Sequence, residues 1–201
     1  MTSDAHWPEH WPEHWPEHWP EHWPDGAVFT VGHSTRTIEA FIALLKAYGV
    51  EQLADVRTVP RSRHNPQFNA DAFAASLADA GVAYVAMPAL GGLRHPRKDS
   101  PNAGWRNASF RGYADYMQTE AFREAVERLA DLGRQRPTAI MCAEAVPWRC
   151  HRSLVADALG VRGVAVVEIL SEADWRMHRL TPFARVDGTT ITYPPAQERL
   201  I

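Results

Sequence analysis

From residue 27 onward, hydrophobic positions alternate between short strand-like runs and longer helical patterns. The strand-like runs are apolar, rich in β-branched residues and bounded by glycine, proline or polar residues, as buried strands are. They predict strands at Ala27–Val31, Gln52–Val56, Val82–Met87, Thr138–Met141 and Val164–Leu170.

Helical periodicity occupies the segments between these runs. Thr37 is placed to cap a helix whose apolar positions are Ile38, Phe41, Ile42 and Leu45, and Gly49 ends it. A second helix runs from the cap Asn69 to Ala80, before Gly81.

The second half of the chain begins with a loop from Leu90 to Trp105, too rich in glycine, proline and charge for regular structure and long enough to suggest a functional loop. Phe110–Gln135 then has a helical pattern that can break at Gln118–Thr119, with Tyr113, Met117, Phe122, Val126 and Leu129 on one stripe. Pro147 suits the first position of a last helix that runs to Leu159. After Ser171 the pattern is mixed, and Tyr193–Pro195 indicates a tail packed on the surface or exposed.

This order predicts an α/β fold: a three-layer structure with a mostly parallel five-stranded sheet and helices on both faces, of the Rossmann or flavodoxin type. Right-handed crossovers place every strand-to-helix loop at the carboxyl edge of such a sheet. Polar residues that follow the predicted strands are therefore expected to converge there, namely His33, Asp55, Arg57, Gly91–Gly92, Cys142 and Glu144.

The N-terminal segment has a different character. Residues 6–25 repeat His-Trp-Pro-Glu four times and end in His-Trp-Pro-Asp. A proline at every fourth position prevents a helix and suits no sheet ladder. We expect residues 1–26 to be a disordered low-complexity tail and residues 27–201 to form a single α/β domain. The tail binds metal weakly through its histidines, binds a partner through its aromatic side chains, or has no selected role.

Composition excludes several classes. No apolar run approaches the roughly 18 to 20 residues of a membrane span, and the N-terminus lacks the basic and apolar parts of a secretory signal. Two cysteines are too few for a disulfide-stapled fold. These features favour a cytoplasmic protein without membrane contact.

The charge is unevenly distributed. The net charge is −3, but residues 1–25 hold six acids and no base, so the rest of the chain has 18 acids and 21 bases. Between residues 57 and 111 there are three acids and eight bases: Arg57, Arg61, Arg63, Arg94, Arg97, Lys98, Arg106 and Arg111. Such a segment suggests an anionic partner, a small anionic substrate or nucleic acid, although a solvated basic surface explains it as well.

The most informative segment is Cys142–Arg152, which holds two cysteines, a histidine and two arginines. A thiol near a helix N-terminus and arginine can have a lowered pKa. His151 is a candidate proton acceptor, and Arg149 or Arg152 can hold an anion.

Three mechanisms compete for this segment. A thiolate cradle that wraps an oxyanion between Cys142 and Arg149 is disfavoured, because Glu144 repels an anion, Pro147 has no N–H and the loop has no glycine. Zinc ligation by Cys142, Cys150 and His151 has an unusual spacing and needs a fourth ligand such as His33. In the third, Glu144 and Asp55 act as acid and base beside phosphate-binding arginines, with the cysteines structural or redox-sensitive.

Many separate motifs of residues 27–170 resemble one bacterial and archaeal family, the domain of unknown function family 488. They are Val31-Gly32-His33-Ser34, Asp55-Val56-Arg57, Pro60-Arg61-Ser62-Arg63, Asn65-Pro66-Gln67-Phe68-Asn69, Leu90-Gly91-Gly92, Phe110-Arg111-Gly112-Tyr113-Ala114-Asp115-Tyr116-Met117, Cys142-Ala143-Glu144 and Pro147-Trp148-Arg149-Cys150-His151-Arg152. The resemblance implies a compact cytoplasmic α/β domain and assigns no reaction. The repeat of residues 6–25 is not part of the family's pattern.

Taken together, the sequence predicts an enzyme, a hydrolase or transferase, that acts on a phosphorylated or nucleotide-like substrate. The expected catalytic residues are Cys142, Glu144, His151, His33 and Asp55. The residues expected to bind substrate are Ser34, Arg57, Arg61, Arg63, Tyr113, Arg149 and Arg152. No cofactor is expected, with zinc on Cys142, Cys150 and His151 as the alternative.

A nucleic-acid-binding module, or a module whose cysteines sense oxidation or metal, is the competing function. A wholly structural role for the cluster is the third reading. The sequence leaves the oligomeric state undetermined.

Overall fold

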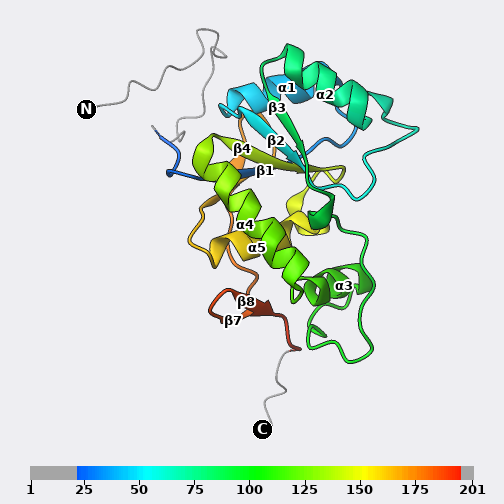
Figure 1. Ribbon diagram of the computed structural model, residues 1–201, viewed down its shortest axis with the longest axis vertical. Coiled ribbons are helices and arrows are strands. Elements are labelled where there is room, and N and C mark those ends of the chain that lie inside the picture. Colours follow the sequence, from blue (N-terminus) through cyan, green and yellow to red (C-terminus); the bar gives the residue numbers. More distant parts are fainter. Residues whose placement is uncertain (1–21, 196–201) are drawn as a thin grey trace.

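The computed structural model describes residues 22–195 of the chain. The expected disordered tail lies almost entirely outside these residues. Within them a central sheet is covered by helices on both faces, with α1 and α2 at one end of the view in Figure 1 and α3 at the other.

The five expected strands are present and mutually parallel: β1 (Val28–Gly32), β2 (Gln52–Asp55), β3 (Ala83–Ala86), β4 (Thr138–Cys142) and β5 (Val166–Ile169). A sixth strand, β6 (Trp175–Met177), pairs antiparallel with β5 and gives the order β3-β2-β4-β1-β5-β6. The three-layer α/β fold is thus confirmed with one more strand than expected. A three-residue edge strand leaves too short a pattern to be recognised in the sequence.

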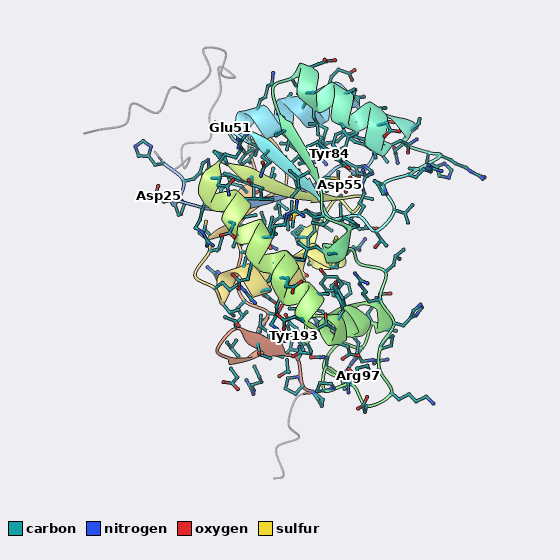
Figure 2. The ribbon with its side chains drawn as sticks, in the orientation of Figure 1. Asp25, Glu51, Asp55, Tyr84, Arg97 and Tyr193 are labelled. Carbon is teal, nitrogen blue, oxygen red and sulfur yellow. The ribbon has the colours of Figure 1, made fainter. Side chains whose placement is uncertain are left out.

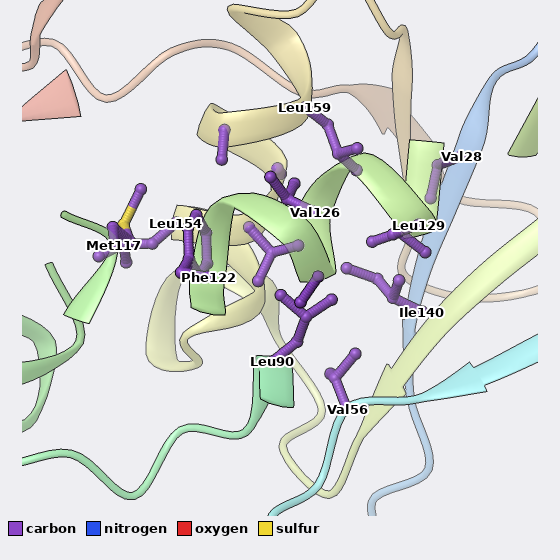
Figure 3. Close-up of a cluster of buried hydrophobic side chains, with 14 of the residues drawn as sticks. Val28, Val56, Leu90, Met117, Phe122, Val126, Leu129, Ile140, Leu154 and Leu159 are labelled. Carbon is purple, nitrogen blue, oxygen red and sulfur yellow. The ribbon is translucent and has the colours of Figure 1, made fainter. Parts of the chain in front are cut away.

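Each face of the sheet has its own apolar core. Helices α1 (Ile38–Ala47) and α2 (Ala70–Asp79) cover one face through Phe41, Leu45, Phe73 and Leu77. Helices α3 (Ala108–Tyr116), α4 (Glu120–Gln135) and α5 (Arg152–Gly160) cover the other. Figure 3 shows Val126 and Leu129 of α4 packed with Leu159 of α5 and Ile140 of the sheet.

Local sequence signals account for most helix ends. The Thr37 hydroxyl accepts a hydrogen bond from the Ala40 N–H at 3.2 Å, as an N-cap does. Gly49 and Gly81 follow α1 and α2 with φ of +66° and +78°, a conformation that costs glycine little. Asn69 stands at the N-cap of α2, but its side chain accepts from the Ser62 N–H instead.

The expected break in the long helical pattern is confirmed. α3 ends at Tyr116 and α4 begins at Glu120, with the Thr119 hydroxyl accepting from the Phe122 N–H at 3.3 Å. The predicted stripe of Tyr113, Met117, Phe122, Val126 and Leu129 is buried in full.

The expectation for Pro147 is wrong in one respect. Pro147 opens a short 3₁₀ helix, η3 (Pro147–Arg149), and α5 begins only at Arg152. Cys150 and His151 therefore lie in the junction between the two helices. Proline favours the first position of either helix type, so its presence does not say how far the helix continues. Two other 3₁₀ helices, η1 (Pro66–Phe68) and η2 (Pro88–Leu90), also begin at proline.

The C-terminal segment is also more ordered than predicted. It forms the hairpin of β7 (Arg185–Asp187) and β8 (Thr190–Thr192), and Tyr193 is fully buried rather than on the surface. The Tyr193 hydroxyl donates to Asp157 of α5 at 2.8 Å. This bond anchors the hairpin to the helix beside which Figure 1 shows it.

Asp157 belongs to a buried charged cluster centred on His178. The two ring nitrogens of His178 bond to Asp157 at 2.8 Å and Glu168 at 2.7 Å, and Arg176 donates to the second Glu168 oxygen at 2.5 Å. Burial alone would lower the pKa of His178, but the two carboxylates raise it to about 9. His178 is therefore a cation at neutral pH and joins β6, β5 and α5.

Replacing His178 with Ala is expected to lower the free energy of unfolding by about 3–5 kcal/mol, because two buried carboxylates lose a shared cation. Since folding raises this pKa from 6.5 to about 9, the stabilisation is complete below about pH 6.5 and is lost as the pH rises through 9. Urea unfolding across this range measures both effects, with exposed His95→Ala as the control. Parallel pH profiles for wild type and His178→Ala would contradict the assignment.

Among residues 22–195, no helix has the length and apolar character needed to cross a membrane.

Candidate functional site around Cys142 and Cys150

The carboxyl ends of the central strands meet at one edge, as the topology requires. Gly32 at the end of β1 pairs with Cys142 at the end of β4, and the His33 N–H donates to the Cys142 carbonyl at 3.0 Å. Asp55 at the end of β2 pairs with Met141. The candidate residues after these strands therefore share one end of the sheet.

The two faces of the sheet nevertheless separate them. Side chains alternate along a strand, so Met141 and Cys142 point to opposite faces. Cys142 lies in the core beneath α4 and α5, whereas Met141 lies in the core beneath α1 and α2. Asp55 is in register with Met141 and shares its face. One edge thus carries two different polar clusters.

The cluster on the α4 and α5 face is built on the two cysteines. Cys142 ends β4, and Cys150 follows η3. Both are buried and free, and their sulfur atoms are 2.6 Å apart in an S–H···S contact. The segment between Cys142 and Cys150 thus folds back, so that Cys150 lies against the end of β4.

Arg152 is the charged group of this cluster and is completely buried. Its Nε donates to the Cys142 sulfur at 3.0 Å, and its terminal nitrogens donate to the Thr30 hydroxyl and the Glu144 carbonyl, each at 2.7 Å. Among residues 22–195, no carboxylate lies within ion-pair distance of this guanidinium. The thiol groups are therefore what can neutralise it.

The electrostatics of the pair follow from this arrangement. Burial alone would raise the pKa of Cys150, but the hydrogen bond from Cys142 and the Arg152 charge lower it to about 6. Burial and the same S–H···S bond raise the pKa of Cys142 well above its usual range. The pair therefore holds one thiolate and one thiol at neutral pH. Burial would lower the pKa of Arg152, but the charge of the sulfurs raises it.

His151 stands beside this thiolate. Its Nδ1 is 3.5 Å from the Cys150 sulfur, and its Nε2 is 3.3 Å from the Val56 carbonyl. Burial is the main cause that lowers the pKa of His151, so the ring is neutral near pH 7. A Cβ at Gly92 would lie 2.4 Å from His151 Nδ1, which explains why glycine occupies that position. A neutral imidazole at hydrogen-bond range can exchange a proton with the sulfur.

The Ala143–Glu144 backbone passes directly over β1. A Cβ at Gly32 would lie 1.7 Å from the Glu144 carbonyl oxygen, so only glycine permits this path. The Glu144 N–H faces the Cys142 sulfur at 3.3 Å and its carbonyl faces Arg152, while its side chain is exposed. The backbone polar groups of Glu144 point inward to the cluster and form no cradle for an external oxyanion.

A pocket of about 330 Å³ lies over the sulfurs. Cys142, Cys150 and His151 form its inner wall. Val59, Leu93 and Arg149 are exposed residues at its rim. The Arg149 side chain has no hydrogen bond or ion pair within the part of the chain that the structure describes, so this cation can meet a ligand.

The cluster on the opposite face contains Asp55. Asp55 accepts from the Arg57 side chain at 2.6 Å and from the Tyr84 hydroxyl at 2.9 Å, and Figure 2 shows Asp55 and Tyr84 side by side. His33 stacks on Phe68 at 4.2 Å, and its Nε2 is buried without a partner among the described residues. Burial lowers the pKa of His33. These contacts order the loop after β2 and keep Asp55 and His33 away from the sulfurs.

The other predicted residues are dispersed. Tyr113 is buried, donates to the Leu90 carbonyl at 2.9 Å and lies 5.0 Å from the His151 ring. Arg61 and Arg63 are exposed on the loop after β2. Ser34 continues the β1 ladder with φ of +50°, a strained value for serine. Of the residues expected to bind substrate, only Arg57 and Arg149 line the pocket over the sulfurs.

Metal ligation finds little support in this geometry. In the described part of the chain, no group of three or more His, Cys, Asp or Glu residues is arranged to hold a metal ion. The Arg152 guanidinium donates to the Cys142 sulfur at 3.0 Å, so one of the expected ligands already faces a fixed cation. The geometry therefore gives no reason to assign zinc to Cys142, Cys150 and His151.

Two contributions escaped the sequence analysis. Thr30 lies inside a strand that reads as wholly apolar, yet its hydroxyl binds Arg152. Val59 and Leu93 are exposed at the pocket rim although they are apolar. Side chains alternate along a strand, so Thr30 could have been predicted to lie on the same face of the sheet as Cys142.

Replacing Arg152 with Met is expected to raise the thiolate pKa from about 6 to above the usual thiol value, because the buried cation beside the sulfurs is lost and burial then dominates. The pH dependence of thiolate absorbance and of alkylation measures this shift. Arg152→Lys keeps the charge and should retain part of the lowering, and Arg149→Met removes an exposed cation as the matched control. A folded Arg152→Met protein that still holds a thiolate at neutral pH would refute the electrostatic account.

Comparison with known proteins gives one match. The family model described as "Domain of unknown function DUF488" matches residues 37–159, which exceeds half of the chain. The matched range contains both cysteines, His151 and Arg152. Neither the curated proteins nor the solved structures gave a match.

Proposed function

The chain belongs to the DUF488 family, and we propose that it is a thiol-dependent enzyme whose Cys142–Cys150 dithiol reduces a small anionic disulfide. The expected nucleophile is Cys150, and Cys142 resolves the intermediate.

A single observation carries this proposal: two free sulfurs lie 2.6 Å apart beneath a pocket, with a buried guanidinium as their counterion. A thiolate attacks disulfides, and a second thiol in contact can displace the first product. A structural cysteine pair needs neither a lowered pKa nor a buried arginine. The charge on Arg152 therefore favours chemistry over packing.

The reaction proceeds in two displacements. The Cys150 thiolate attacks one sulfur of the substrate disulfide, whose S–S bond breaks, and the leaving thiolate takes a proton from water. Cys142 then attacks the Cys150 sulfur, the bond from Cys150 to the substrate half breaks, and the Cys142 proton passes to this departing sulfur, which leaves as the second thiol. Two electrons pass from the dithiol to the substrate, which becomes two thiols, and a small thiol reductant restores the pair.

Exposed Arg149 and exposed Glu144 both line the pocket, so we propose a substrate with an apolar body whose anionic group pairs with Arg149 and lies away from Glu144. Val59 and Leu93 provide apolar rim contacts, and Arg149 provides a cation without another partner in the described chain. Arg57 is engaged by Asp55 and cannot serve a ligand in the same way. The proposed substrate is therefore anionic, as expected from the sequence, but the bond that reacts is a disulfide instead of a bond to phosphate or a nucleoside.

Oxidised glutathione is expected to convert the reduced protein to an intramolecular disulfide, seen as the loss of two hydrogen masses and of both titratable thiols. Cys142→Ser should accumulate a mixed disulfide on Cys150, because the resolving thiol is missing. Cys150→Ser should react more slowly than Cys142→Ser, because the remaining Cys142 thiol is buried and burial is the largest cause that raises its pKa. Mass spectrometry of quenched time points distinguishes these species.

The substrate preference has its own control. Arg149→Gln should slow reaction with oxidised glutathione about two- to fivefold, the effect of about 0.5–1 kcal/mol from one exposed charge, and leave a neutral disulfide such as hydroxyethyl disulfide unaffected. Equal slowing with both probes would show that Arg149 does not select the anion. Cysteines that stay reduced in excess oxidised glutathione would exclude the proposed activity.

A further inference from the structure

We propose that a second cavity, separated from the sulfurs by η3, binds a nucleotide-like ligand that combines a flat aromatic ring with a phosphate. The cavity has a volume of about 800 Å³ and is lined by Trp105, Trp148, Phe183, Arg176, His178 and Arg179. This inference does not depend on the dithiol reaction. Its residues come from the long loop, η3, β6 and the segment after β6.

The cavity offers a flat aromatic surface. Trp148 is about half exposed, at 52%, and Arg176 lies over its ring at 4.8 Å. Trp105 and Phe183 also line the cavity and meet edge to face, with ring centroids 5.0 Å apart. Tryptophan and a stacked guanidinium are surfaces on which nucleobases stack regardless of sequence.

Polar groups of the cavity match the rest of such a ligand. Arg179 lines the cavity with N–H groups, which can donate hydrogen bonds to a phosphate or a ring nitrogen. Ser153 of α5 also lines the cavity with a hydroxyl. A purely apolar ligand would leave these polar groups unused.

The charge of the wall favours an anion. Glu168 is neutralised by its hydrogen bonds from Arg176 and His178, and Asp157 lies behind His178 with Tyr193. Arg179 is exposed and forms no ion pair or side-chain hydrogen bond within residues 22–195. One uncompensated cation beside an aromatic surface is the arrangement that a phosphate attached to a base requires.

The size of the cavity limits the ligand. A volume of about 800 Å³ lies within the usual range for small-molecule and cofactor sites. One wall of the cavity is formed by the hydrogen-bonded cluster of His178, Glu168 and Arg176. These bonds hold the wall in place before a ligand binds. A mononucleotide fills such a space with its ring on Trp148 and its phosphate toward Arg179.

Titration calorimetry of the reduced full chain with AMP, adenosine and ribose 5-phosphate tests this proposal. AMP should bind at one site, adenosine should bind about tenfold more weakly and ribose 5-phosphate should give no measurable heat, because stacking provides most of the affinity. Binding of ribose 5-phosphate as tight as that of AMP would show a simple anion site and overturn the proposal.

Variants place the ligand in this cavity. Trp148→Leu should weaken both AMP and adenosine about tenfold or more. Arg179→Ala should weaken AMP about fivefold and leave adenosine unchanged. Arg128→Ala removes an exposed arginine of α4 and should change nothing. Circular dichroism verifies folding of each variant, and AMP affinity that survives both Trp148→Leu and Arg179→Ala would place binding elsewhere and refute the assignment.

Discussion

One buried charge organises the carboxyl edge of the sheet. The Arg152 guanidinium is removed from water entirely and meets sulfur, a hydroxyl and a backbone carbonyl, with no carboxylate of the described chain as its partner. An uncompensated buried cation costs several kcal/mol, so the fold is stable only if the neighbouring thiols carry negative charge. The lowered pKa of Cys150 follows from this requirement. The charge state of the sulfur and the stability of the fold therefore have the same cause.

The geometry around this charge explains several motif residues. Gly32 has no side chain because the Glu144 carbonyl that receives Arg152 passes over it, and Gly92 has none because His151 fills the space. Cys142 and Thr30 provide acceptors from adjacent strands. Residues far apart in the sequence thus depend on one another through contacts within a few ångströms of the guanidinium.

Much of the fold was predictable, since all five parallel strands and the break between α3 and α4 follow from local patterns. β6 and the buried Tyr193 were not, because they depend on pairing with β5 and on Asp157 rather than on local periodicity. The convergence of strand ends was predictable from topology. The separation of His33 and Asp55 from the sulfurs was not recognised. The end of a strand determines at which edge of the sheet a residue lies, whereas its odd or even position along the strand determines to which face its side chain points. Glu144 illustrates another limit: its backbone serves the site while its carboxylate faces solvent.

The same charge bears on the energetics of the proposed reaction. Formation of a Cys142–Cys150 disulfide removes the thiolate and leaves Arg152 buried with only neutral acceptors. The reduced form keeps the ion pair, so the protein environment stabilises the dithiol relative to the disulfide. A dithiol whose reduced form is stabilised has a higher reduction potential, as thiol oxidants do, and its disulfide is readily reduced by small thiols. Arg152 thus lowers the thiol pKa, which supplies the attacking thiolate, and also eases the return to the reduced state. Both effects arise because the guanidinium is buried, so an exposed arginine such as Arg149, screened by water, would produce neither to the same degree.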